Sequence, residues 1–127
     1  MKLLLDTHVV LWWLRDDPRL GPRSRAMIAG GNNEILVSIA TPWEVAIKYR
    51  IGKLDESSMA VLDAIGSTGM SVIDIRRPHL EALEKLPKGH GDPFDHLILA
   101  QAGAEAATLM TGDRQMAAYG IPCIGIS

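Results

Sequence analysis

The chain alternates short, uniformly apolar runs with longer segments whose apolar residues recur at helical spacing. The short runs predict strands over residues 3–5, 34–39, 70–75, 107–110 and 122–126. The longer segments predict helices over residues 7–14, 22–29, 42–51, 57–65, 78–86, 92–106 and 114–119, and the stretch 88–91 predicts a loop. Strands that alternate with helices pair in parallel through crossover helices. The pattern therefore predicts an α/β fold in which helices cover both faces of a parallel sheet.

The composition narrows the class of protein. A chain of 127 residues that is 47% hydrophobic predicts one folded domain over residues 1–127 and excludes a disordered chain. The formal net charge of -2 excludes a protein that wraps nucleic acid by bulk positive charge, but it leaves room for a local basic groove. Cys123 is the single cysteine, which excludes an intramolecular disulfide and a cysteine-based zinc cluster.

The expected location is the cytoplasm. One cysteine is compatible with a reducing compartment. The apolar opening resembles a signal peptide only briefly, because Asp6 and His8 interrupt it. Other apolar runs are far too short to span a membrane, so no membrane partner is expected.

Acidic residues follow the predicted strands at the ends where parallel α/β sheets collect their functional groups. Asp6 follows the first strand, Glu44 lies one turn into the helix after the second, and Asp113 follows the fourth. Asp92 and Asp95 begin the helix that leads into the fourth strand. We expect these carboxylates to converge at one edge of the sheet.

Convergence of this kind favours a bound divalent cation. Two carboxylates roughly 5 Å apart repel each other by about 3 kcal/mol at an effective dielectric constant near 20. Hard oxygen ligands without clustered histidine or cysteine select Mg²⁺ or Mn²⁺. Such a metal polarises phosphoryl oxygens and activates a water molecule for hydrolysis. No glycine-rich phosphate loop competes with this interpretation.

Each acid also has an ordinary structural explanation. Asp92 precedes proline at a helix start, so we favour an N-cap there over metal ligation. Asp95 opens a helix that is apolar on nearly every face, and there we favour ligation. For Asp6, helix capping and ligation are equally supported, and Asp113 is explained equally well as a turn or cap residue. Glu44 is also placed to pair with Lys48 one turn later.

Threonines and basic residues accompany these acids. Thr7 and Thr111 can bind water, phosphate or a neighbouring carboxylate, whereas helix capping is favoured for Thr41. Lys48 and Arg114 lie close to acids in the sequence and, with the two threonines, predict a rim that contacts substrate phosphates. The four histidines lack metal-ligand spacing, and no catalytic role is assigned to them.

Four segments together resemble the motifs of PIN-domain ribonucleases of the VapC toxin type. The resemblance covers the whole chain in order and spacing, and the segments are residues 3–12 (LLLDTHVVLW), 38–48 (SIATPWEVAIK), 92–102 (DPFDHLILAQA) and 109–113 (LMTGD). It implies a Rossmann-like, three-layer fold with a central parallel sheet of about five strands. It also implies an endoribonuclease that depends on Mg²⁺ or Mn²⁺, with Asp6, Glu44, Asp95 and Asp113 as its catalytic and metal-binding residues.

The resemblance implies partners as well. The expected substrate is RNA, often structured or transfer RNA, and the expected assembly is a homodimer. A cognate antitoxin would mask the active site, as in type II toxin–antitoxin systems. Two alternatives remain at this point: a small phosphatase or phospho-acceptor domain, and a catalytically silent PIN-like module that binds protein. The first lacks the Asp-x-Asp signature at Asp6, and the presence of all four acids argues against the second.

Overall fold

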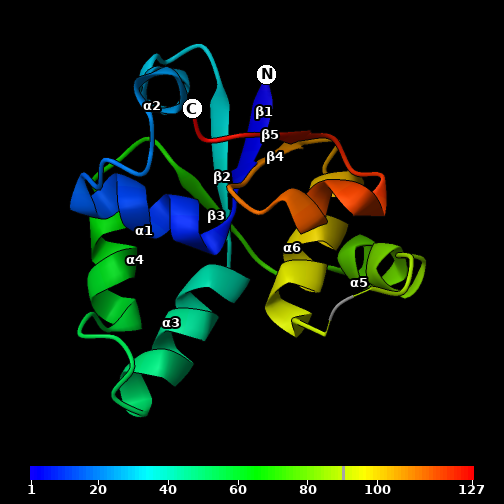
Figure 1. Cartoon of the computed structure of the whole chain (residues 1–127). Helices are drawn as coiled ribbons and strands as arrows, with labels where there is room; N and C mark the ends of the chain where they lie inside the picture. The colour runs from blue at the N-terminus through cyan, green and yellow to red at the C-terminus, as the bar shows by residue number, and fades with distance from the viewer. Residues whose placement is uncertain (90) are drawn as a thin grey trace.

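The computed structural model describes residues 1–89 and 91–127, so His90 of the expected 88–91 loop lies outside the described residues. Five parallel strands form one sheet in the order β3-β2-β1-β4-β5. Helices cover both faces of the sheet (Figure 1), which confirms the expected fold class.

The predicted elements are all present, with shifted ends. The strands are β1 (Lys2–Leu5), β2 (Glu34–Ser38), β3 (Ser71–Ile73), β4 (Thr108–Met110) and β5 (Cys123–Ile124). The helices are α1 (Thr7–Arg15), α2 (Pro22–Ala29), α3 (Ala40–Arg50), α4 (Ser58–Gly66), α5 (Arg77–Glu84), α6 (Pro93–Ala104) and the 3₁₀ helix η1 (Arg114–Tyr119). The last three strands are shorter than the apolar runs that predicted them, because an apolar run marks burial and not the extent of strand pairing.

The strand order reverses at β1, and this position determines where the site lies. The chain passes from β1 outward through β2 to β3, then crosses back to place β4 on the other side of β1. Leu4 at the centre of β1 pairs with Leu36 of β2 and with Leu109 of β4. Ligand sites in open α/β sheets form at such a reversal, beyond the carboxyl ends of the strands. The residues that follow β1 and β4 meet there.

Alternate residues of the central strand enter two separate hydrophobic cores. Leu3 and Leu5 pack with α1, α2 and α4 on one face of the sheet, and Leu4 packs with α6 and η1 on the other. Successive side chains of a strand point to opposite faces, so an unbroken apolar run is required when both faces are covered. Figure 1 shows these two helical layers on either side of the sheet.

Helix α6 is buried along most of its length, as its sequence predicted. Its residues 97–102 are all buried, including the polar Gln101. No helix in the described ranges is long and apolar enough to cross a lipid bilayer.

Candidate functional site

Asp6 lies between β1 and α1 in the chain, and its side chain is hydrogen-bonded to α1 and to the segment after β4. Its Oδ1 accepts a hydrogen bond from the Thr7 main-chain N–H at 2.8 Å, which makes it the N-cap of α1. Its Oδ2 accepts a hydrogen bond from the Thr111 hydroxyl at 2.7 Å. Burial raises the pKa of Asp6, and these two hydrogen bonds oppose the rise. Asp6 is therefore a cap, and its carboxylate also lies in the crevice where the strand order reverses.

The threonines cross-link the same crevice. The Thr7 and Thr41 hydroxyls lie 3.0 Å apart and share a hydrogen bond, although they are distant in sequence. The helix cap favoured for Thr41 was wrong, because α3 begins earlier, at Ala40, and leaves the Thr41 side chain inside the helix facing α1. Thr111 contacts a carboxylate, as one of its expected roles required.

Glu44 lies on α3 and is 93% buried, with 7% of its surface exposed. Its Oε2 forms an ion pair with the Lys48 ammonium group, one helical turn away, with 2.9 Å between Oε2 and Nζ. The expected surface pair is thus present, but the carboxylate belongs to a buried position beside α1 and α6. The lysine end of the pair is the more exposed, with 40% of its side-chain surface accessible against 10% for Glu44.

The two aspartates at the start of α6 differ in their hydrogen bonds. Asp92 Oδ1 accepts hydrogen bonds from the Phe94 and Asp95 main-chain N–H groups at 2.9 and 3.3 Å. Asp92 is thus an N-cap, as predicted. The Asp95 carboxylate accepts no hydrogen bond from residues 1–89 or 91–127.

Asp113 closes the crevice from the loop after β4. Its Oδ1 accepts a hydrogen bond from the Gln115 main-chain N–H at 2.9 Å, so it caps η1. Its own N–H donates to the Thr111 hydroxyl oxygen at 3.0 Å, while that hydroxyl donates to Asp6. Thr111 therefore connects two of the expected acids through one oxygen atom.

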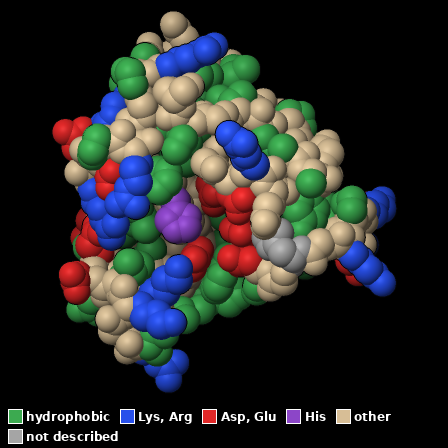
Figure 2. All heavy atoms as spheres, in the orientation of Figure 1, with side chains coloured by type: hydrophobic (Ala, Val, Ile, Leu, Met, Phe, Trp, Pro, Cys, Tyr) green, Lys and Arg blue, Asp and Glu red, His purple; other side chains and the backbone are tan. Residues whose placement is uncertain are grey.

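The acids are close enough to act on one another. Burial, and after it the charges of four other carboxylates, together raise the pKa of Asp95 to about 7; the four are Asp6, Asp92, Glu44 and Asp113. Figure 2 shows a patch of acidic side chains on this face of the molecule. The four acids expected to form the site thus share one electrostatic environment.

The chemistry of this donor set fits a hard divalent cation. A positive ion would relieve the repulsion around Asp95 and supply the partner that its carboxylate lacks among the described residues. Within residues 1–89 and 91–127, no three acidic, histidine or cysteine side chains are placed so that they would ligate one ion as they stand. Binding would therefore require some of these carboxylates to turn toward a common point.

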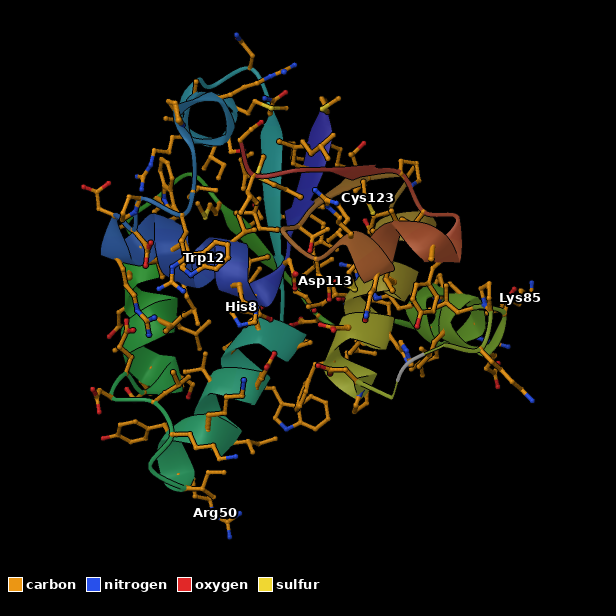
Figure 3. The ribbon with its side chains drawn as sticks, viewed as in Figure 1. His8, Trp12, Arg50, Lys85, Asp113 and Cys123 are labelled. Atoms are coloured by element: carbon orange, nitrogen blue, oxygen red, sulfur yellow. The ribbon has the colours of Figure 1, made fainter. Side chains whose placement is uncertain are left out.

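Two hollows adjoin the acids. One, of about 390 Å³, is lined by Thr111, Asp113 and Arg114. The other, of about 180 Å³, is lined by Thr7, Glu44 and Lys48 among others. All four residues expected to form the rim thus line a hollow beside the acids. Arg50 is also a basic residue of α3, but it lies at the end of the helix that is far from the acids (Figure 3).

The smaller hollow also contains residues to which the sequence assigned no function. They are His8, Trp12 and Arg15 on α1, and Arg19 in the following loop. The first three are separated by four and three positions, which places them on one face of a helix. That spacing was visible in the sequence, but it does not show that this face borders the acids.

The fold and the site define an α/β protein with a parallel sheet, whose acidic residues gather where the strand order reverses. Within that class, residues 3–122 match the PIN domain family, so the chain belongs to it. The expected family is confirmed.

Known proteins agree with this assignment. The chain is 37% identical over 59 residues to Ribonuclease VapC16 of Mycobacterium tuberculosis, a match that spans 44% of this chain and 42% of that protein. The fold resembles VapBC2 from Rickettsia felis bound to a DNA fragment from their promoter, with a TM-score of 0.78, 20% identity and full coverage of both chains. It also resembles DNA-bound VapBC from Salmonella typhimurium, with a TM-score of 0.72, 18% identity and coverage of 100% and 99%. At these identities the structural likeness shows the fold.

Proposed function

We propose that the protein is a metal-dependent endoribonuclease of the VapC type, the toxin of a type II toxin–antitoxin pair. The observation that carries the proposal is the position of Asp95. Its carboxyl group has a pKa raised to about 7 at the point where the charges of Asp6, Glu44 and Asp113 also act. The name of the M. tuberculosis relative, a ribonuclease, supports the activity.

Four residues would hold Mg²⁺ or Mn²⁺ in this site. We assign direct ligation to Asp6 and Asp95, while Glu44 and Asp113 close the crevice and hold water. The bound cation would supply a Lewis acid for the phosphoryl oxygens and would lower the pKa of a water molecule. Thr111 and Thr7 donate to Asp6 and keep its carboxylate oriented. Lys48 and Arg114 border the two hollows and attract the phosphates on either side of the scissile bond.

The proposal extends to the partners of the chain. The substrate is RNA, including structured or transfer RNA, and the protein acts in the cytoplasm as one domain over residues 1–127. A cognate antitoxin masks the crevice, which the VapBC names of the structural neighbours support. We propose a homodimer, for which exposed apolar side chains are available at Trp43 and Ile47 on α3 and at Ile51 directly after it.

Cleavage of RNA by purified protein tests the activity. With Mn²⁺ we expect wild-type protein to cut transfer RNA, and we expect EDTA to abolish the cutting. Asp6→Asn and Asp95→Asn remove a charged ligand at nearly constant shape, so cleavage should fall by at least a hundredfold. Asp63→Asn, at an exposed position of α4, is the matched control and should cleave as wild type does.

The same proteins test metal binding without activity. Mn²⁺ should raise the melting temperature of wild type and Asp63→Asn, because a ligand that binds only the folded state stabilises it. The rise should be absent in Asp6→Asn and Asp95→Asn. Unchanged RNA cleavage by both variants would refute the assignment. A mass increase of one phosphoryl group after incubation with acetyl phosphate would instead favour the phospho-acceptor alternative.

A further inference from the structure

Three planar side chains meet along one side of α1 and the loop that follows it. The ring centroids of His8 and Trp12 are 5.7 Å apart, with 33° between the ring planes. The Arg19 guanidinium carbon lies 5.3 Å from the centroid of the Trp12 ring. We call these three residues the stacking shelf. Its outer members are exposed: His8 on the first turn of α1, and Arg19 with 68% of its side-chain surface accessible.

The stacking shelf borders Glu44, one of the four acids of the proposed catalytic site. It lines the hollow of about 180 Å³ together with Thr7 and Glu44. Figure 3 labels His8 and Trp12 on α1, with Asp113 across the crevice from them. In the same orientation, Figure 2 shows a histidine side chain between the acidic patch and groups of basic side chains. A ligand on the shelf would therefore adjoin a phosphate held at the acids.

Basic side chains line the hollow of the stacking shelf, and each is ion-paired. Arg15 and Lys48 line it with Arg19; Arg15 pairs with Glu56 and Lys48 with Glu44. Asp17 accepts two hydrogen bonds from the Arg19 side chain, from Nε at 3.2 Å and from Nη2 at 3.0 Å. A guanidinium carries five N–H donors, so Arg19 retains donors for a phosphate while Asp17 holds it over the Trp12 ring. Aromatic rings beside arginines are the elements with which proteins hold single-stranded nucleic acid.

The size of the hollow limits its occupant to a single base, with the sugar and phosphate of the nucleotide outside it. Pockets for drug-sized ligands measure about 300–1,000 Å³, so a hollow of about 180 Å³ is small. A base inside a duplex has both faces covered by its neighbours. An unpaired base has a free face and can stack on an aromatic side chain.

We infer that the stacking shelf is a substrate subsite for one unpaired nucleotide of an RNA strand, next to the phosphate that is cut. The base stacks against the His8–Trp12 pair, and Arg19 donates to the adjoining phosphate. This inference rests on the proposed ribonuclease function and names the residues that position its substrate. His8 acts here through its ring face, and no proton transfer is assigned to it.

Binding measured without cleavage tests the inference. In Asp95→Asn protein, a fluorescein-labelled single-stranded oligoribonucleotide should bind at least tenfold more tightly than the same strand annealed to its complement. Adding His8→Ala or Arg19→Gln should weaken single-strand binding about fivefold to tenfold each. Arg50→Gln, which removes an exposed arginine at the far end of α3, is the matched control and should change binding less than twofold. Arg19→Lys, which keeps the charge but loses the planar group, should restore only part of the affinity.

Tryptophan fluorescence distinguishes stacking from charge attraction. Unlabelled RNA should quench the fluorescence of the Asp95→Asn protein, and Trp12→Phe should remove most of that quenching while Trp43→Phe retains it. Equal affinity for single and double strands, or wild-type binding by both shelf variants, would overturn the inference.

Cleavage assays separate this result from the function itself. If wild-type protein cuts RNA with Mn²⁺ and the shelf variants bind and cut equally well, the subsite is wrong and the ribonuclease function stands. If wild-type protein does not cut RNA, the function fails, whatever the shelf variants do. Shelf variants that bind RNA normally but lose a protein partner would assign the surface to that partner and overturn the inference.

Discussion

Asp95 shows how one side chain can carry both a stability penalty and a function. Its carboxyl group is half-buried on α6, and burial together with four neighbouring acids raises its pKa to about 7 from an ordinary value of 3.8. Ionisation of this group is therefore harder in the folded chain than in the unfolded one. A protein keeps such an arrangement when the charge serves a purpose, as it does where a cation binds.

A pH-dependent stability follows from this pKa. Between about pH 4 and pH 7, unfolding lets Asp95 release a proton, so the free energy of unfolding falls as the pH rises and levels off above about 7. Asp95→Asn cannot ionise and lacks this loss. In metal-free buffer we expect it to melt a few degrees higher than wild type at pH 8, with the difference vanishing near pH 3.5.

Thermal melts across this pH range, monitored by circular dichroism, measure the effect. Asp63→Asn is the matched control, since this exposed aspartate should give the same melting temperatures as wild type at every pH. An Asp95→Asn protein that is less stable than wild type at pH 8 would contradict the raised pKa of Asp95.

At the scale of elements, helix starts place the acids. Asp6 caps α1, Asp92 caps α6, and Asp113 caps η1. A helix N-terminus carries partial positive charge, so it stabilises carboxylates that would otherwise repel one another. Helix capping and metal ligation were weighed as alternatives for Asp6 and Asp113. The structure shows that both residues are caps through Oδ1. The proposed function would use the other carboxylate oxygen of each, which in Asp6 also accepts the hydrogen bond from Thr111.

Asp92 offers a test in which capping is separated from charge. Asp92→Ala removes the acceptor for two main-chain N–H groups and should lower the free energy of unfolding by about 1 kcal/mol. Asp92→Ser keeps a capping oxygen and should recover most of that loss. Urea denaturation measures both.

The metal response provides the second readout for Asp92. If its role is capping alone, Asp92→Ser should show the same Mn²⁺-induced rise in melting temperature as wild type. Loss of that rise in a normally stable Asp92→Ser protein would instead make Asp92 a ligand.

At the scale of the whole molecule, the last residues of the chain return to α2. The Gly21 N–H donates to the Ile126 carbonyl at 2.7 Å, and the Ser24 N–H donates to the Ser127 carbonyl at 2.8 Å. A Cβ at Gly21 would collide with the main chain of Ser127. Close packing of two backbones thus ties the segment after β5 to the helical layer that carries α1.

Gly21→Ala tests this closure. The added methyl group must displace main-chain atoms, so we expect a loss of roughly 1–3 kcal/mol in the free energy of unfolding. Gly66→Ala is the matched control, because a Cβ added there would meet no described atom within 4 Å beyond the adjoining residues and the backbone of its own helix. Removing a glycine from the end of α4 should leave stability unchanged or raise it by up to about 1 kcal/mol. Equal urea midpoints for both variants would contradict the close contact.

Local pattern was sufficient for the fold class and for selecting the candidate acids. Apolar runs of β-strand length, separated by helical periodicity, specify a parallel sheet covered on both faces, since a strand buried on both sides cannot alternate with polar residues. The positions of Asp6, Glu44, Asp95 and Asp113 relative to strand ends follow from the same pattern. Helix ends shifted by one or two residues, because capping and fraying depend on neighbours in space.

Only the tertiary structure decided which groups meet. Thr111 binds Asp6 across 105 positions of sequence, and Thr7 meets Thr41 across 34. His79, without an assigned role in the sequence, is buried and places Nε2 2.8 Å from Glu105 Oε2 at the end of α6. Periodicity along a chain records whether a residue is buried, but distances between residues far apart in sequence depend on strand order and helix packing. Each candidate acid could therefore be selected from the sequence. That the acids gather in one crevice, beside a hollow lined by aromatic and arginine side chains, is visible only in the folded chain.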